Sequence, residues 1–95
     1  MAARTLVLTR RFLRALDALQ ATGGTQRGAS VAATLRALTS AAALPSAGDV
    51  EAMIPPVVRA WVRRVNGENL WVWYQATDAT VTLVALTSSP PVPIG

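Results

Sequence analysis

The chain has 95 residues, of which 52% are hydrophobic and only 15% are charged, and it carries a formal net charge of +4 at pH 7. Such a chain is too apolar to be disordered, and its length predicts a single domain over residues 1–95 with one modest core. Cysteine and histidine are both absent from the sequence. Their absence excludes disulfides, thiolate and imidazole chemistry and the usual zinc sites, so we expect no cofactor and no metal.

The first residues have the features of a strand that leads directly into a helix. Thr5–Leu8 is rich in β-formers, and Arg10–Gln20 has apolar residues at helical spacing. Thr9 is expected to cap this helix, because its hydroxyl can accept a hydrogen bond from the first turn. The apolar stripe of the helix consists of Phe12, Leu13, Leu16 and Leu19.

Three arginines occupy the other side of this helix, at Arg10, Arg11 and Arg14. Positive charge near a helix N-terminus is unfavourable against the helix dipole, so a functional interpretation places an anion or an acidic partner here. The alternative is a plain solvated face, which is the more frequent case. The excess of arginine over acidic residues favours an anionic partner, either a nucleic acid or an acidic protein.

A second helix is predicted at Ser30–Ala42, after a break at Gly23–Gly24 and before Pro45. The short break makes an antiparallel helical hairpin the natural arrangement of the two helices. The next segment, Val50–Val58, is interpreted as a crossing segment, because two consecutive prolines within it would stop a helix.

Three runs of β-formers follow, at Ala60–Val65, Leu70–Thr77 and Thr80–Thr87. Asn66–Gly67 is a strong hairpin signal between the first two runs, since both residues tolerate positive φ. Asp78–Ala79 is a second, weaker turn signal. The sequence therefore predicts a three-stranded antiparallel sheet after the helical hairpin.

Side chains alternate across a strand, which sorts the residues of this sheet into two faces. The more aliphatic face is assigned to the core, with one arginine as a misfit, and contains Trp61, Arg63, Val65, Leu70, Val72 and Tyr74. The other face contains Val62, Arg64, Trp71, Trp73 and Gln75. Because two helices cover only one side of such a sheet, we predict an α+β two-layer domain with one sheet face open.

The open face would display Trp71 and Trp73 beside Arg64, which is a surface suited to binding a partner. The alternative is that the C-terminal tail covers the two indoles. This tail, residues 88–95, contains three prolines and is predicted to be extended. Met1–Leu8 is too short and too soon followed by arginine for a signal peptide, and no run is suited to span a membrane, so a cytoplasmic protein is expected.

The chain opens with TLVLTRRFLRALDAL and closes with WVRRVNGENLWVWYQATDATVTLVALTSSPP. Together with the order strand, helix, helix and three strands, these segments resemble the RelE/ParE superfamily of bacterial type II toxins over nearly the whole chain. The resemblance implies a RelE-like two-layer fold and a small cognate antitoxin that binds the toxin as a hetero-oligomer. RelE- and HigB-like members are ribosome-dependent mRNA endonucleases, whereas ParE-like members poison DNA gyrase.

The ribonuclease branch works without metal, with basic side chains around the scissile phosphate and the 2′-hydroxyl as nucleophile. By the resemblance, Arg64 takes the basic position at the end of the strand before the hairpin, with Arg63 as its neighbour. Trp71 or Trp73 stands where the family frequently has a basic residue, and Tyr74 matches an aromatic position that is mostly structural. The C-terminal segment of that branch often carries Arg, Lys, His or Tyr, whereas this chain reads TSSPP there.

Two functions follow from the resemblance. In the first, the chain cuts ribosome-bound mRNA, with Arg59, Arg63 and Arg64 at the phosphate and an indole stacked on a base. General acid–base catalysis would then require Tyr74 or an acidic residue such as Glu68 or Asp78. In the second, which the changed C-terminal segment favours, the chain is a non-enzymatic binder, either a gyrase inhibitor or a degenerate toxin that binds only its antitoxin. The predicted substrate- or partner-binding residues are Trp71, Trp73, Tyr74, Arg10, Arg11 and Arg14.

Overall fold

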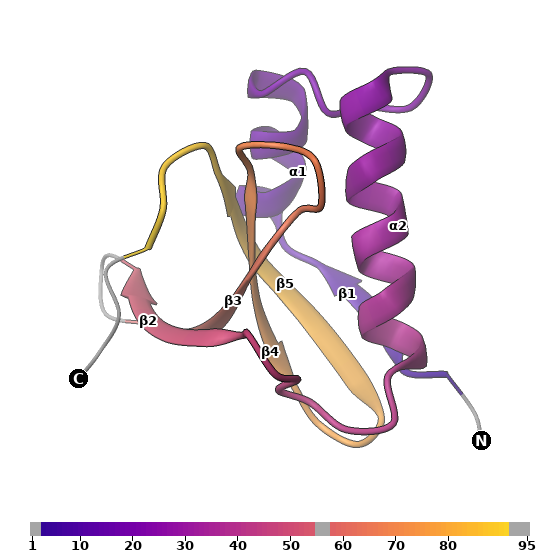
Figure 1. Ribbon diagram of the computed structural model, residues 1–95, viewed down its shortest axis with the longest axis vertical. Coiled ribbons are helices and arrows are strands. Elements are labelled where there is room, and N and C mark those ends of the chain that lie inside the picture. The colour runs from indigo at the N-terminus through magenta and orange to yellow at the C-terminus, as the bar shows by residue number, and fades with distance from the viewer. Residues whose placement is uncertain (1–2, 55–57, 92–95) are drawn as a thin grey trace.

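Two helices pack on one face of a five-stranded mixed sheet, which makes the protein an α+β domain (Figure 1). The structure is a computed structural model that describes residues 3–54 and 58–91. Along the chain, the elements are β1 (Thr5–Leu8), α1 (Arg10–Ala18), α2 (Gln26–Ser40), β2 (Val50–Ile54), β3 (Val58–Arg64), β4 (Trp71–Ala76) and β5 (Thr80–Thr87).

The strands lie in the order β1-β5-β4-β3-β2, with β1 parallel to β5 and all other neighbours antiparallel. The predicted three-stranded sheet therefore forms the centre of a larger one. β1 joins it beside the last strand, and the long connection that parallel pairing requires consists of the helical hairpin and the three strands that follow it. The interpretation of Val50–Val58 as a crossing segment is wrong for Val50–Ile54, which pairs with β3 along its length. Prolines that follow a strand do not prevent pairing at a sheet edge.

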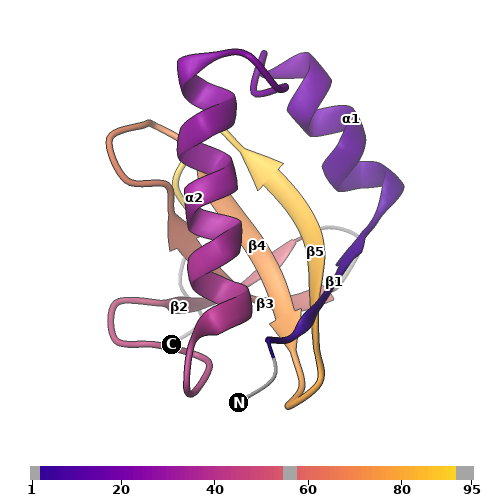
Figure 2. The same ribbon diagram turned by 90° about the vertical axis from the view of Figure 1, so that its right-hand side faces the viewer.

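The two helices lie side by side over the same face of the sheet (Figure 2). Thr9 caps α1 as predicted, since its hydroxyl accepts a hydrogen bond of 3.2 Å from the N–H of Phe12. α2 begins at Gln26, before the predicted start at Ser30, because Thr25 caps it in the same way and accepts a bond of 2.8 Å from Gly28. Threonine hydroxyls thus define both helix starts.

A β-bulge in β5 determines which residues of this strand face the helices. Trp73 is opposite Ala85 and Tyr74 is opposite Leu83, so Val84 has no partner across the strands. After the extra residue, the alternation of side chains shifts by one position. As a result, Leu83 before the bulge and Leu86 after it are both buried in the core under the helices, although they are three residues apart.

The main core lies between the helices and the sheet, and it confirms the predicted face of the central strands. It contains Phe12, Ala21, Val31, Leu38, Val65, Leu70, Val72, Tyr74, Val81, Leu83 and Leu86. Within the predicted stripe of α1, Phe12 is fully buried, whereas Leu13 is 46% exposed and lies outside the core. A second, smaller cluster lies on the other face of the sheet, away from the helices, and contains Ala52, Ala60, Val62, Trp73 and Ala85.

Candidate functional site

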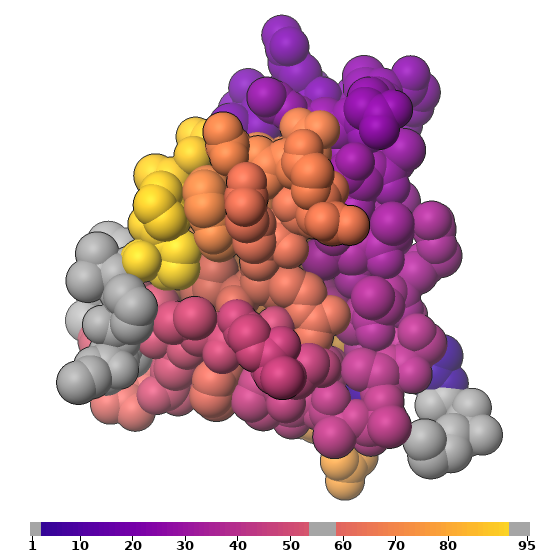
Figure 3. All heavy atoms as spheres, viewed as in Figure 1, coloured from indigo at the N-terminus to yellow at the C-terminus, as the bar shows by residue number. Residues whose placement is uncertain are grey.

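A groove of about 510 Å³ runs between α2 and the end of β3. α2 contributes mostly small side chains to it, whereas the β3 side contributes two guanidinium groups. The lining residues are Gln26, Ala29, Ser30, Ala33, Thr34, Ala37, Arg63, Arg64 and Asn66. In Figure 3 the atoms of α2 and those of the β3–β4 hairpin lie next to each other on the same face of the molecule. The groove therefore brings together Arg63 and Arg64, the two arginines that the sequence singled out for the end of this strand.

Arg63 is held by an acidic residue that sequence reasoning did not single out. Its Nε lies 2.8 Å from Oδ1 of Asp49, and its Nη2 lies 3.0 Å from Oδ2. The Asp49 side chain is only 2% exposed and also accepts hydrogen bonds from the hydroxyl of Tyr74 and from the N–H of Ser46. This network explains how an arginine is accommodated on the core face of β3.

The network shifts the pKa values of its members in ways that keep the ion pair charged. Burial raises the pKa of Asp49, but the hydrogen bonds that its carboxylate accepts outweigh burial, and the pKa lies below its ordinary 3.8. The hydrogen bonds that Arg63 donates to Asp49 raise the pKa of Arg63. Burial, and then the hydrogen bond to Asp49, raises the pKa of Tyr74 well above its ordinary 10.0. The phenol of Tyr74 therefore stays protonated near neutral pH, and its proton is already engaged with Asp49.

Arg64 has a different environment. Its Nε donates to the backbone carbonyl of Glu68 at 3.2 Å and its Nη2 donates to Oδ1 of Asn69 at 3.0 Å, and its guanidinium lies 5.8 Å from the ring centroid of Trp71. Within the described residues, no carboxylate forms an ion pair with Arg64. The positive charge of Arg64 at the groove is therefore available to an anionic ligand.

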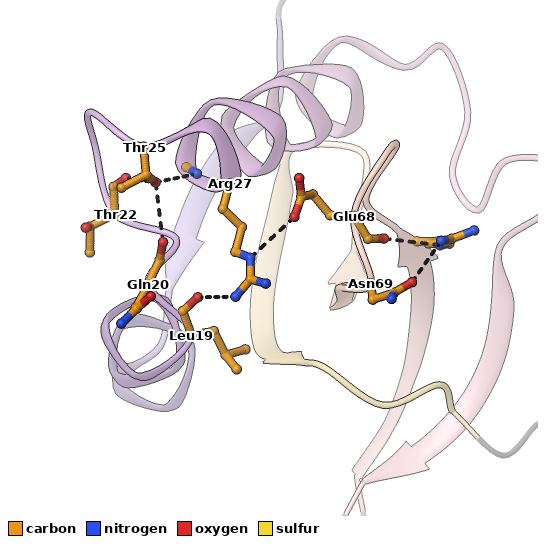
Figure 4. Close-up of polar contacts among 9 residues, drawn as sticks. Leu19, Gln20, Thr22, Thr25, Arg27, Glu68 and Asn69 are labelled. Carbon is orange, nitrogen blue, oxygen red and sulfur yellow. Dashed lines mark hydrogen bonds and ion pairs between the residues drawn. The ribbon is translucent and has the colours of Figure 1, made fainter.

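The loop that positions Arg64 is itself fixed to the helices. Arg27 of α2 lies 3.3 Å from Oε1 of Glu68 through its Nε, and its Nη1 donates to the carbonyl of Leu19 at 2.7 Å (Figure 4). Glu68 thus connects Arg27 to the loop whose backbone holds Arg64. Because Glu68 is paired in this way, it is not a free carboxylate at the groove.

The two tryptophans predicted for an open face have different environments. Trp73 is only 5% exposed, because it packs in the smaller cluster and donates from Nε1 to Oγ1 of Thr87 at 3.0 Å. Only Trp71, which is half-buried and lies beside Arg64, is accessible for stacking. The expected pair of exposed indoles is therefore a single indole. The alternative in which the tail covers them concerns residues 88–95, of which 92–95 lie outside the described residues.

The remaining predicted arginines are not part of this groove. Arg59 is on β3 four residues before Arg63, roughly 13 Å away along the strand, and its Nη1 lies 3.6 Å from Oε1 of Glu51. Asp78 is in the turn at the far end of β4. The arginines of α1 lie on an exposed face of a helix that packs on β5 rather than on β3, and they are Arg10, Arg11 and Arg14.

The groove is suited to binding rather than to proton transfer. Its described lining offers the cation of Arg64, the amides of Gln26 and Asn66, and hydroxyls on α2, but no free carboxylate and no imidazole. Sequence reasoning missed the contribution of α2 because the helix face that lies beside β3 is decided by tertiary packing, and it also placed the start of that helix at Ser30 rather than at Gln26. The only signal for an earlier start was the threonine before Gln26, which is an N-cap residue.

In residues 3–54 and 58–91, no cluster of three or more acidic side chains is arranged to hold a metal ion. None of the described helices has the length and apolar character needed to cross a membrane.

Comparisons of the chain with models of protein families, with curated proteins and with solved structures find no significant match.

Proposed function

We propose that this chain is the toxin of a bacterial type II toxin–antitoxin system of the RelE/ParE kind, and that it acts in the cytoplasm as a binding protein rather than as a nuclease. A helical hairpin on one face of a sheet whose first strand lies beside its last supports a RelE-like two-layer fold. The proposed partners are a cognate antitoxin and, as the cellular target, DNA gyrase. The same proposal includes a degenerate toxin, which would bind the antitoxin but no cellular target.

The observation that carries the binding function is the engagement of Arg63 and Tyr74 by the buried Asp49. Cleavage of RNA by its own 2′-hydroxyl needs one group to accept a proton and another to donate one to the leaving oxygen. Tyr74 has a raised pKa and an occupied hydroxyl, and the described lining of the groove offers no other acid or base. One free arginine can bind an anion, but it does not transfer protons near neutral pH.

The groove has the features of a site for a protein segment that carries a carboxylate. Three alanines of α2, Ala29, Ala33 and Ala37, line its helical wall and are exposed. Such short side chains allow a second backbone to approach α2 closely. Arg64 at the same groove uses its Nε and one N–H of Nη2 on Glu68 and Asn69, and its remaining Nη N–H groups can donate to both oxygens of a carboxylate.

Cleavage of mRNA on the ribosome is the second candidate, and one contact favours it. The guanidinium of Arg64 lies over the ring of Trp71, with 5.8 Å between its Cζ and the ring centroid. A phosphate at Arg64 and a base stacked on Trp71 would be held by two adjacent residues of one sheet. This arrangement would bind single-stranded RNA, with cleavage limited to electrostatic stabilisation by arginine.

The test is inducible expression in bacteria, with mapping of mRNA 5′ ends on ribosomes and a gyrase supercoiling assay on the purified chain. We expect growth arrest without new mRNA ends, and rescue when the product of the adjacent reading frame is co-expressed. New mRNA ends inside the ribosomal A site would establish the second candidate instead. Normal growth, together with no complex between the two purified products, would reject the toxin proposal altogether.

A pair of matched variants connects this activity to the groove. Arg64→Ala removes the uncompensated cation from the groove, so we expect it to relieve growth arrest. Arg36→Ala removes the same charge from an exposed position of α2 that does not line the groove, so we expect it to remain toxic. If the two variants are equally toxic, or equally harmless, the site is not at Arg64.

A further inference from the structure

The outer edge of β1 leaves backbone hydrogen-bonding groups open. β1 is the terminal strand of the sheet, and among the described residues its one strand neighbour is β5. The N–H groups of Thr5 and Thr9 donate toward β5, at 2.9 and 3.4 Å. In a parallel ladder, alternate residues bond to the same neighbour, so Val7 also bonds to β5, whereas Leu6 and Leu8 direct their N–H and C=O groups outward.

The same two residues expose apolar side chains. Leu6 is opposite the buried Val81, and Leu8 is opposite the buried Leu83, so both leucines are on the sheet face that the helices cover. They are nevertheless 37% and 45% exposed, and Leu13 of α1 is 46% exposed. Figure 2 shows β1 as the outermost strand, leading directly into α1. Open backbone groups and apolar side chains therefore coincide at the same two residues of one edge, the combination that sheet proteins normally avoid.

The charged side chains near this edge are mostly positive, with the exposed Asp78 of the β4–β5 turn as an acidic residue near the start of β1. Arg10 and Arg14 are exposed on α1, and neither forms an ion pair among the described residues. Arg4 precedes the strand and donates to the backbone carbonyls of Ala41 and Thr77. A second copy of this strand would bring arginines of the same sign together at both ends, which is unfavourable. A negatively charged segment has no such penalty.

From these observations we infer that the outer edge of β1 binds an extended acidic segment of a partner protein as a sixth strand of the sheet. Main-chain hydrogen bonds form at Leu6 and Leu8, and alternate apolar side chains of the segment pack on these two leucines. Acidic side chains of the segment are attracted by Arg10 and Arg14. This surface is on β1, which β5 and β4 separate from the strand β3 of the α2–β3 groove, so the inference does not depend on the proposed function.

The probe for the test is a synthetic, soluble peptide of about eight residues in which valine alternates with glutamate. Binding to the full chain is followed by NMR, through the amide resonances and the hydrogen exchange of β1. We expect saturable shifts and slower exchange at the amides of Leu6 and Leu8, the two that point outward. A peptide in which valine alternates with lysine is the charge control, and we expect it to bind at least about tenfold more weakly.

Two variants of equal charge separate strand addition from general attraction. Leu8→Glu places a carboxylate on the apolar side of the edge, and we expect it to weaken binding of the acidic peptide at least about tenfold. Val7→Glu adds the same charge to the same strand, at a residue that is 43% exposed but points to the other sheet face. For this control we expect the affinity for the acidic peptide to fall less than about threefold, because only long-range repulsion acts on it. Far-UV circular dichroism shows whether each variant keeps its fold.

Several results would overturn the inference. Equal weakening by Leu8→Glu and Val7→Glu would show attraction without strand addition. Unperturbed Leu6 and Leu8 amides at millimolar peptide would show that the edge is closed to a partner. A dimer in sedimentation that Leu8→Glu dissociates would identify a second copy as the occupant. In the groove variant Arg64→Ala, the peptide-dependent shifts of the Leu6 and Leu8 amides should be unchanged, so a failure of the proposed function and a failure of this inference are distinguishable.

Discussion

The side chain of Arg63 meets that of Asp49 edge to edge, with 2.8 Å from Nε to Oδ1 and 3.0 Å from Nη2 to Oδ2. Asp49 belongs to the loop before β2, so this contact joins the loop to the end of β3. It also determines the electrostatics of the groove, because it neutralises one of the two adjacent arginines and leaves Arg64 as the free cation.

The first prediction concerns the stability that this contact provides. Asp49→Asn leaves the half-buried Arg63 without its counter-charge, so we expect a loss of about 2–4 kcal/mol in the free energy of unfolding. Urea unfolding followed by tryptophan fluorescence measures it. Glu51→Gln is the control, because it removes the partner of Arg59 from a pair exposed to solvent, and we expect a loss of at most about 1 kcal/mol. Similar losses for the two variants would contradict the structural role of Asp49.

The second prediction concerns acidic pH. The folded pKa of Asp49 is below its ordinary value, so the unfolded chain takes up this proton at a higher pH than the folded one. The stabilisation by Asp49 is therefore present above about pH 4 and is lost as the pH falls through the folded pKa. The measurement compares unfolding of the wild type and of Asp49→Asn from neutral pH downward. Their difference in stability should shrink below about pH 4, and a constant difference would refute the prediction.

The third prediction concerns alkaline pH and Tyr74, the single tyrosine of the chain. Its folded pKa is raised, so the stability linked to its proton is present below about pH 10 and is lost as the pH rises through the folded pKa. Ultraviolet absorbance reports this ionisation without interference from another phenol. We expect the phenol of the native chain to titrate at higher pH than that of the urea-unfolded chain. Coincident titrations would mean that the hydroxyl is accessible to solvent.

Much of the sheet was predictable because its strands carry local signals. β5 has the predicted bounds, and Gly67 has φ of 80° in the predicted turn, a conformation that glycine adopts without strain. β2 was not predictable in the same way. Its five residues carry no turn signal that separates them from the prolines that follow, and their pairing with β3 is a tertiary effect.

The candidate site was only partly predictable for a similar reason. The position of Arg63 and Arg64 at the end of a strand follows from the hairpin signal, and alternation placed Tyr74 on the core face correctly. That Asp49 would neutralise Arg63 does not follow, because the two residues are 14 positions apart and meet only through the pairing of β2 with β3. The burial of Trp73 likewise depends on that pairing, which brings Ala52 into its cluster.

The fourth prediction concerns Gly28, which is buried inside the first turns of α2. Alanine normally stabilises a helix interior relative to glycine. Here a Cβ would lie 2.0 Å from the carbonyl oxygen of Thr22, a backbone atom that cannot move away independently. We therefore expect Gly28→Ala to destabilise the protein by about 1–3 kcal/mol or more. Gly23→Ala is the control, because a Cβ at that position meets no atom within 4 Å, and a larger loss there would contradict the packing of the loop on α2.

The fifth prediction concerns Thr9, whose hydroxyl serves two elements at once. It accepts from Phe12 at the start of α1, and it donates to the carbonyl oxygens of Leu83 and Val84 at the bulge, at 2.8 and 3.1 Å. Thr9→Val keeps the shape but removes both functions, so we expect a loss of about 1–3 kcal/mol in thermal or urea unfolding. Thr9→Ser retains the hydroxyl and should recover most of that loss. If serine is as destabilising as valine, the methyl group and not the hydroxyl connects α1 to β5.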